Sequence, residues 1–129
     1  LYSEIEIPYI FENIHHRNLK ICLDYGHRNF LTPNFDIMKE YGKFVSVLHI
    51  HDNYGETDEH LPIYKGNIDW NYVAAGLRDK IDIVLSSEIK LKQPEMYKDI
   101  LKENLKGLNF LEKLILNSEK VNDFKREKI

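Results

Sequence analysis

The sequence predicts an α/β fold in which parallel strands alternate with helices. Three short runs rich in apolar residues, 19–24, 44–51 and 81–89, have the length of buried strands. Stripes of apolar residues at helical spacing separate these runs, and strands separated by helices pair in parallel through right-handed crossovers. The 129 residues are enough for one domain with a real core, so residues 1–129 are expected to form a single unit.

The predicted helices are recognised by apolar residues three and four positions apart. Tyr25-Gly26 is expected to stop the first strand, residues 29–34 read as a loop, and residues 117–129 are polar and expected to fray. Asp69 is a good N-cap for the third helix, and Gly42 is a plausible C-cap for the second. The inward residues are Ile7, Ile10, Phe11 and Ile14 in the first helix, Phe35, Met38 and Tyr41 in the second, Trp70, Val73, Ala74 and Leu77 in the third, and Tyr97, Ile100, Leu101, Leu105, Leu108, Leu111 and Ile115 in the last.

Acids and histidines gather where the predicted strands end. Residues 49–60 hold three histidines and four acids directly after an apolar run, while Asp24, His27 and Glu88 follow or end the other two strands. Any one of these residues also fits a solvated strand-to-loop junction. Together they suit a borderline divalent metal such as Zn, Mn, Co or Fe, because such ions take imidazole nitrogen and carboxylate oxygen. In (β/α) barrels and doubly wound sheets this edge carries the site. We find no glycine-rich phosphate loop after any strand.

Composition and net charge limit the classes of partner expected for this chain. The formal charge of −3 and the pI near 6.1 give no basic footprint, which argues against a nucleic-acid partner. No apolar run approaches the roughly 20 residues of a membrane span, so a membrane partner is not expected. The single cysteine, Cys22, lies in an apolar run and is expected to be a buried thiol in a reducing cytoplasm.

Four motifs carry a resemblance to a known family. They are Leu-Asp-Tyr-Gly-His at 23–27, Leu-His-Ile-His-Asp-Asn at 48–53, Asp-Glu-His-Leu-Pro-Ile-Tyr-Lys-Gly-Asn-Ile-Asp-Trp at 58–70, and Ser-Glu at 87–88. In this order they resemble the C-terminal half of the xylose isomerase-like barrel superfamily, which includes sugar-phosphate isomerases and epimerases and endonuclease IV-type apurinic-site endonucleases. The resemblance implies that the chain is the C-terminal half of a (β/α)8 TIM barrel.

The resemblance also implies roles for individual residues. It makes Asp24, His49 and Glu88 the core metal ligands, with Glu88 also the catalytic proton-transfer group. It makes His27, Asp58 and His60 the ligands of a further metal, as in the endonuclease branch. We interpret three more residues as substrate contacts. These are His51, Asp52 and Lys65. The cofactor expected is a divalent cation (Zn, Mn, Co or Mg), whose identity stays open.

Two departures from the family pattern stand out. Tyr64 replaces the first glycine of the family's Gly-x-Gly, Lys65 replaces the usual acid, and only Gly66 is kept. The first half of the barrel, with its own glutamate ligand, has no counterpart here, since a complete barrel needs about 250 residues. Glu4 and Glu6 precede a helix and cannot replace that glutamate. The expected partner is therefore the N-terminal half-barrel or a second copy of the chain.

The expected function is that of a metal-dependent isomerase or epimerase of a sugar or sugar phosphate, acting by proton transfer through an enediolate. The isolated chain is expected to be inactive. Two alternatives remain open: an endonuclease IV-like apurinic-site endonuclease, and a non-catalytic half-barrel that serves in binding or assembly.

Overall fold

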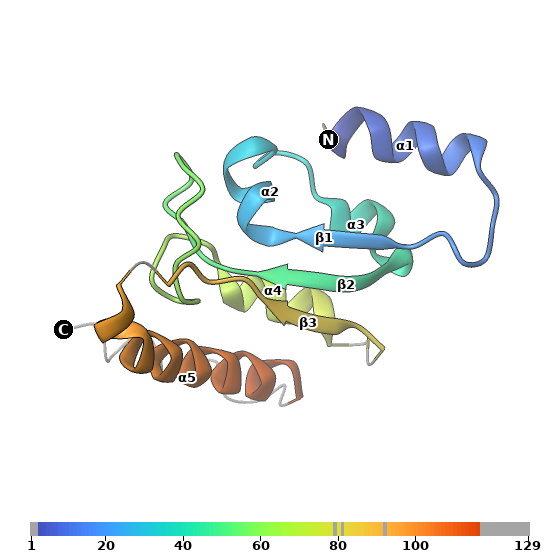
Figure 1. Ribbon diagram of the computed structural model, residues 1–129. Coiled ribbons are helices and arrows are strands. Elements are labelled where there is room, and N and C mark those ends of the chain that lie inside the picture. The colour runs from blue at the N-terminus through green and yellow to red at the C-terminus, as the bar shows by residue number, and fades with distance from the viewer. Residues whose placement is uncertain (1–2, 79, 81, 92, 117–129) are drawn as a thin grey trace.

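The computed structural model describes residues 3–78, 80, 82–91 and 93–116. Within them three parallel strands, β1 (Ile21–Asp24), β2 (Val45–Ile50) and β3 (Val84–Ser87), pair in the order β1-β2-β3. Helices connect them, as Figure 1 shows. The predicted alternation of parallel strands and helices is confirmed. The expected fraying of 117–129 and the start of the third predicted strand at Ile81 lie outside the described residues.

The described residues form five α-helices in addition to the strands. They are α1 (Ser3–Asn13), α2 (Tyr25–Leu31), α3 (Ile37–Tyr41), α4 (Trp70–Leu77) and α5 (Tyr97–Leu116), with short 3-10 turns η1 (Gly42–Phe44) and η2 (Pro94–Met96). Asp69 caps α4 as predicted, because its Oδ1 accepts the amides of Asn71 and Tyr72. Among the described residues, no helix combines the length and apolar character needed to cross a membrane.

The prediction of a loop at residues 29–34 was wrong in part. β1 ends at Asp24, just before Tyr25-Gly26 as expected, but α2 begins immediately at Tyr25 and continues to Leu31, so the first half of the expected loop is helical. The cause is Asp24, whose Oδ1 accepts the amide of His27 at 2.8 Å and so caps the helix. This cap matters for the site, because it fixes His27 one turn above the end of the strand.

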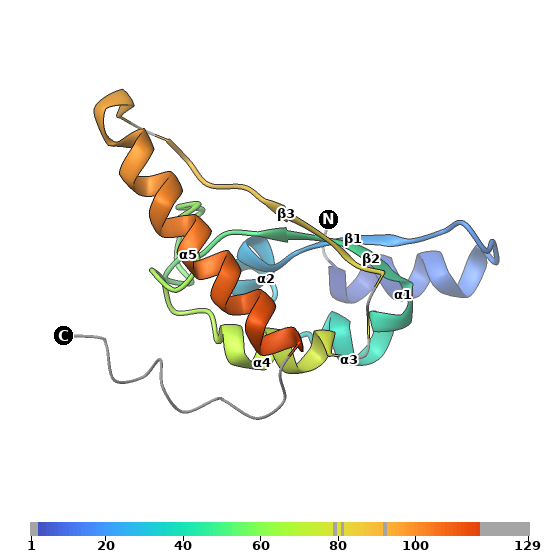
Figure 2. The ribbon, with the colours of Figure 1, turned by 90° about the horizontal axis from the view of Figure 1, so that it is seen from below.

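The helices lie on one side of the sheet, and the other face is open (Figure 2). Leu23 and Leu48 point to the helices and are buried, whereas the register partners Cys22, Val47 and Val84 share the opposite face. Val84 is 61% exposed, and Cys22 is exposed too, which corrects the expectation of a buried thiol. In a closed barrel this face would line the interior.

The inward face of α5 also differs from the prediction. Leu101 and Leu105 are half exposed, because the beginning of α5 extends beyond the end of β3 (Figure 1). The helix turns Asn104 and Gly107 inward instead: Asn104 donates to Ser87 Oγ at 2.8 Å, and a Cβ on Gly107 would lie 2.6 Å from Ile63 Cγ1. Ile14 is likewise exposed, since α1 ends at Asn13. The core is formed mainly by Ile21, Leu23, Ile37, Leu48, Ile50, Ile63, Trp70, Val73, Ala74, Leu77, Leu111 and Leu114.

The long loop between β2 and α4 is held by a buried carboxylate. Asp52 is fully buried; its Oδ2 accepts from Trp70 Nε1 at 2.9 Å, and its Oδ1 accepts from the Asn53 amide at 2.9 Å and the Ile68 amide at 3.3 Å. Gly66 passes so close that a Cβ there would lie 2.3 Å from Asp52 Oδ1. The retained glycine thus serves the packing of the loop.

We predict that Asp52→Ala lowers the free energy of unfolding by about 3 kcal/mol, because two buried donors and one partly buried donor lose their acceptor. Urea unfolding followed by tryptophan fluorescence measures the change. The control is Asp99→Ala, whose exposed carboxylate meets Lys102 at 3.7 Å and should change stability by about 0.5 kcal/mol or less. Equal effects of the two substitutions would contradict the structural role of Asp52.

Candidate metal centre

The first cluster of metal-ligating side chains lies across the ends of the three strands. Asp24 ends β1 and pairs in register with His49 of β2, and Glu88 directly follows β3. His49 Nδ1 lies 2.9 Å from Glu88 Oε1 and 3.7 Å from Asp24 Oδ2. One ligand atom from each of the three lies within 4.8 Å of the others. We call Asp24, His49 and Glu88 the strand-end group; parallel pairing brings its members together, as the sequence predicted.

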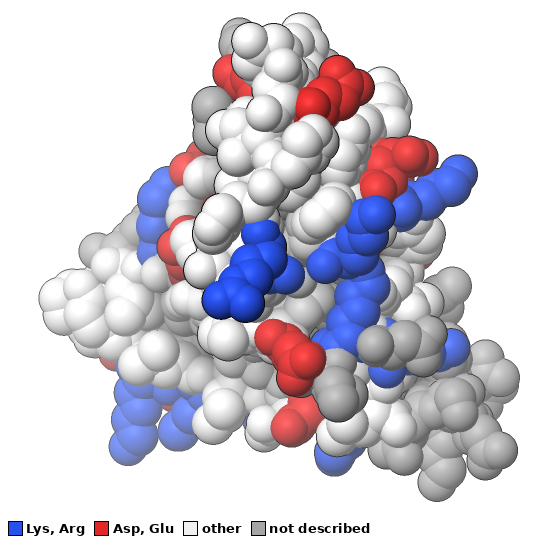
Figure 3. Space-filling model, turned by 90° about the vertical axis from the view of Figure 1, so that its right-hand side faces the viewer, with Lys and Arg blue, Asp and Glu red and all other residues white. Residues whose placement is uncertain are grey.

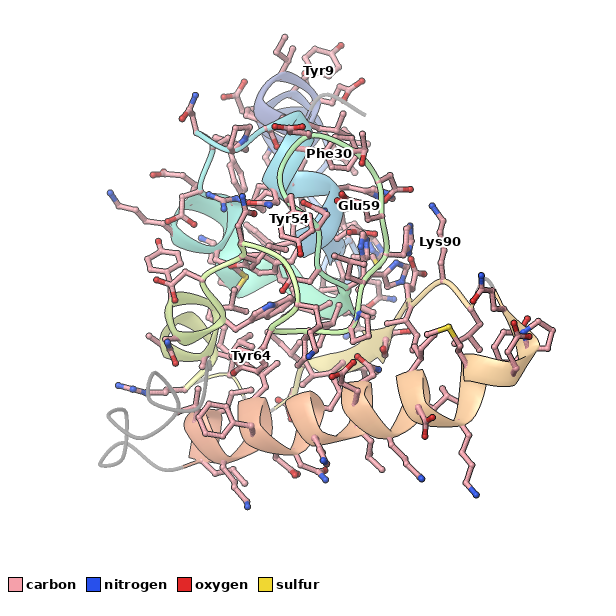
Figure 4. All side chains as sticks on the ribbon, turned by 90° about the vertical axis from the view of Figure 1, so that its left-hand side faces the viewer. Tyr9, Phe30, Tyr54, Glu59, Tyr64 and Lys90 are labelled. Atoms are coloured by element: carbon pink, nitrogen blue, oxygen red, sulfur yellow. The ribbon has the colours of Figure 1, made fainter. Side chains whose placement is uncertain are left out.

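A second cluster lies beside the first, on α2 and the long loop. His27 Nε2 lies 3.3 Å from Asp58 Oδ1, and His60 Nε2 lies 3.0 Å from the same oxygen. The end of the molecule that carries the loop faces the viewer in Figure 4, in which Glu59 marks the loop and Lys90 stands at its side. We call His27, Asp58 and His60 the loop group. The sequence predicted all three as ligands, and the structure brings them together.

Hydrogen bonds outside each cluster orient the imidazoles. His27 Nδ1 lies 3.0 Å from Asp24 Oδ2, and His60 Nδ1 lies 2.5 Å from the carbonyl oxygen of Glu88. With these nitrogens donating, Nε2 of both rings presents a lone pair toward Asp58. Metal-binding histidines are held in this way by an acceptor on the far nitrogen. The members of the strand-end group thus orient the loop group.

His60 occupies an unusual backbone conformation. Its φ is +52°, in the left-handed region that non-glycine residues rarely adopt. Its carbonyl accepts the Lys90 amide at 2.9 Å, and Lys90 Nζ donates to the Asp58 carbonyl at 2.7 Å. These contacts hold the loop against the segment after β3. Strain of this kind, about 1–3 kcal/mol, persists where surrounding contacts enforce it.

Tyr64 shares this backbone feature. It stands where the family has glycine, and its φ of +68° is the conformation that glycine adopts readily. Its ring packs 5.5 Å from Phe110 and 6.4 Å from Trp70 between ring centroids. Burial raises the pKa of its phenol. The ring therefore turns toward α5 and the core.

Asp24 of the strand-end group and Asp58 of the loop group are both held ionised. Burial opposes the charge of Asp24, but hydrogen bonds from His51 and the His27 amide hold its pKa below the usual value. Partial burial likewise opposes the charge of Asp58, but His60 and Lys90 hold its pKa low. Ionised carboxylate oxygens beside oriented imidazole nitrogens fit a divalent ion such as Zn or Mn. The donor set of each group therefore suits a metal.

The three residues interpreted as substrate contacts differ in burial and in their contacts. His51 has no exposed surface, and its ring stacks under that of His60 with centroids 3.8 Å apart, so it offers no face to a substrate. Asp52 is buried in the loop and its oxygens are occupied, which corrects its proposed role. Lys65 is exposed and lies at the edge of a cavity of about 410 Å³, but its Nζ pairs with Glu103 Oε1 at 2.5 Å.

Sequence reasoning missed a network of asparagine amides behind the loop. Asn29 Nδ2 donates to Asn53 Oδ1 at 2.8 Å and to Asn67 Oδ1 at 2.7 Å, and the buried Asn53 donates to the Gly26 carbonyl at 2.8 Å. The network joins α2 to both ends of the loop. Isolated asparagines far apart in the sequence gave no signal of it.

Comparison with known proteins places these features in a family. A family model described as xylose isomerase-like TIM barrel matches residues 1–114. An uncharacterized protein of Methanocaldococcus jannaschii is 39% identical over 99 residues, which are 77% of this chain and 38% of that protein. A second uncharacterized protein of this organism is 36% identical over 105 residues, covering 78% and 36%.

A solved structure agrees with the family match. The crystal structure of a D-tagatose 3-epimerase-like protein resembles the chain with a TM-score of 0.57 and 31% identity, over 81% of this chain and 41% of that one. The chain thus spans about two fifths of the length of the relatives it matches. The fold is confirmed as a partial TIM barrel, and the chain belongs to the xylose isomerase-like TIM-barrel family.

Proposed function

We propose that the chain carries the C-terminal half of the active site of a metal-dependent isomerase or epimerase acting on a sugar or sugar phosphate. The observation that carries this proposal is the strand-end group, in which Asp24, His49 and Glu88 meet within 4.8 Å at the ends of three parallel strands. The likeness to a protein titled D-tagatose 3-epimerase-like supports a carbohydrate substrate.

In this proposal the strand-end group holds a divalent ion. The ion supplies Lewis-acid stabilisation of negative charge that develops on substrate oxygens. Glu88 holds or moves the proton at the carbon beside the carbonyl, because its carboxylate is about one-third exposed and lies on the open side of the sheet. The glutamate expected in the other barrel half would serve the opposite face of the sugar. Two carboxylates on opposite faces can remove and return one proton.

Phosphodiester cleavage of the endonuclease type is the second candidate, favoured by the loop group as a site for a further metal. The cations near the site weigh against it. Lys65 pairs with Glu103, Lys90 is bonded to Asp58, and Arg28 donates to the carbonyls of Pro33 and Phe35. Figure 3 shows basic side chains gathered around the start of the strands, at the opposite end from the site. DNA binding calls for several phosphate contacts near the chemistry.

We predict that the chain binds Mn, Co or Zn and that His49→Ala and Glu88→Ala each weaken binding by about tenfold or more, since each removes a ligand of the strand-end group. Isothermal titration measures the affinity. Acid should weaken binding, because protons compete with the metal for imidazole nitrogen and carboxylate oxygen.

The matched control for this titration is His16→Ala, a histidine exposed to solvent after α1. It should leave the affinity unchanged. If both site substitutions also leave the affinity unchanged, the strand-end group is not the metal site.

We predict that the assembled barrel, with both halves present and a divalent metal, incorporates solvent deuterium into a sugar at the carbon beside the carbonyl. Glu88→Gln should abolish incorporation, because the amide cannot accept the proton. Mass spectrometry of the recovered sugar gives the measurement. Nicking of an abasic duplex without sugar turnover would reverse the order of the two candidate functions.

We also propose that the open face of the sheet is covered by the remaining half-barrel or by a second copy of the chain, since a half-barrel leaves two strand edges and one face uncovered. A half-barrel used only for binding or assembly would need the same cover. Cys22 is exposed on this face, so the accessibility of its thiol measures whether the face is covered.

Alkylation of Cys22 by a maleimide should be fast in the monomeric chain and slowed about tenfold or more in the assembled species, because the partner excludes the reagent. Sedimentation velocity identifies the species, and mass spectrometry measures the rate. Equal rates in monomer and assembly would show that the partner sits elsewhere.

A further inference from the structure

His51 lies between the two metal-ligating groups and belongs to neither in an obvious way. Its side chain has no exposed surface. Its Nε2 lies 3.0 Å from Asp24 Oδ1, and its ring stacks on that of His60 with centroids 3.8 Å apart and planes 4° apart. It therefore touches one member of each group at once.

The stacking argues that His51 does not bind the same ion as His60. A ring nitrogen of His51 lies within 4.8 Å of the ligand atoms of the loop group. An imidazole lone pair, however, lies in the plane of its ring, so an ion bound by His60 lies close to that plane. A parallel ring stacked 3.8 Å away cannot hold the same ion in its own plane. His51 acts on the site through its contacts.

We propose that His51 is a positioning residue, which uses Nε2–H to fix Asp24 so that Oδ2 of this carboxylate faces the proposed metal. This inference rests on the proposed metal centre of the strand-end group. Asp24 Oδ1 accepts both His51 Nε2 and the His27 amide, which leaves Oδ2 toward His49 and His27 Nδ1. Partners of this kind hold a ligand in one orientation and raise metal affinity.

Gly26 supplies the second observation. An ideal Cβ at this position would lie 1.9 Å from Cε1 of His51 and 2.2 Å from its Nε2, a distance that no real contact reaches. Gly26 is buried and its φ is not in the left-handed region, so the requirement is one of space. The glycine of Asp-Tyr-Gly-His is therefore needed to admit the ring of His51. Two motifs that are 25 residues apart form one unit.

The first test compares two substitutions of His51 in a metal titration of the chain with Mn. His51→Gln keeps an N–H near the position of Nε2 and should retain the affinity within about threefold. His51→Leu fills the space without a donor and should lower the affinity about 10- to 100-fold. Urea unfolding with chelator confirms that both variants are folded. Equal loss in Gln and Leu variants, with both folded, would show that His51 only fills space and would overturn the proposal.

The second test is a double-mutant cycle between Gly26 and His51. Gly26→Ala should weaken Mn binding in the wild type, because its methyl displaces the ring. In the His51→Ala background the same substitution should have little further effect, since the ring is gone. Gly76→Ala, with no atom within 4 Å of the added methyl, is the control and should leave binding unchanged. Additive effects in the cycle would overturn the link between the two residues.

A third measurement separates this inference from the metal proposal, because it needs no metal. Nitrogen NMR of the metal-free chain in mildly alkaline buffer should show His51 as the Nε2–H tautomer. His27 and His60 should show Nδ1–H. If the unaltered chain does not bind Mn, the proposed metal centre is wrong. If His51 is the Nδ1–H tautomer, its proposed role toward Asp24 is wrong.

Discussion

Four contacts of the site meet at the carboxylate of Asp24. Oδ1 accepts the His27 amide and His51 Nε2, while Oδ2 lies 3.0 Å from His27 Nδ1 and 3.7 Å from His49 Nδ1. One side chain thus ends a strand, begins a helix and orients the imidazoles around it. The charge is tolerated in this partly buried position because donors surround it. Removal of this carboxylate would loosen both ligand groups at once.

Much of the fold could be predicted, because buried strands and amphipathic helices have distinct periods. The gathering of acids and histidines at one edge of the sheet followed from the rule that parallel strands end there, whereas the choice of Asp24, His49 and Glu88 as ligands came from the resemblance to the family. The start of α2 was not predicted, because Asp24 was interpreted only as a ligand and not as an N-cap. The buried face of α5 was also not predicted. The spacing of Leu101 and Leu105 suggests that they face inward. The helix instead turns Asn104 toward Ser87 and Gly107 toward Ile63. Such contacts depend on partners distant in sequence.

The roles within the long loop were harder to predict than its position. His51, Asp52 and Lys65 all appeared near the site in the sequence, but the loop turns Asp52 to Trp70 and Lys65 to Glu103. Burial, and not residue type, separates a residue that supports the site from one that meets a substrate. His51 is the best example. Its position two residues after His49 suggested contact with a substrate, but its buried ring stacks on the ring of His60.

The left-handed backbone at His60 limits how this protein can change by mutation. Asparagine or glycine would relax the backbone there, but each removes the imidazole that points at Asp58 and stacks on His51. Any other residue keeps the strain and loses the ring. No single substitution at this position therefore both relaxes the backbone and keeps the imidazole in contact with Asp58 and His51.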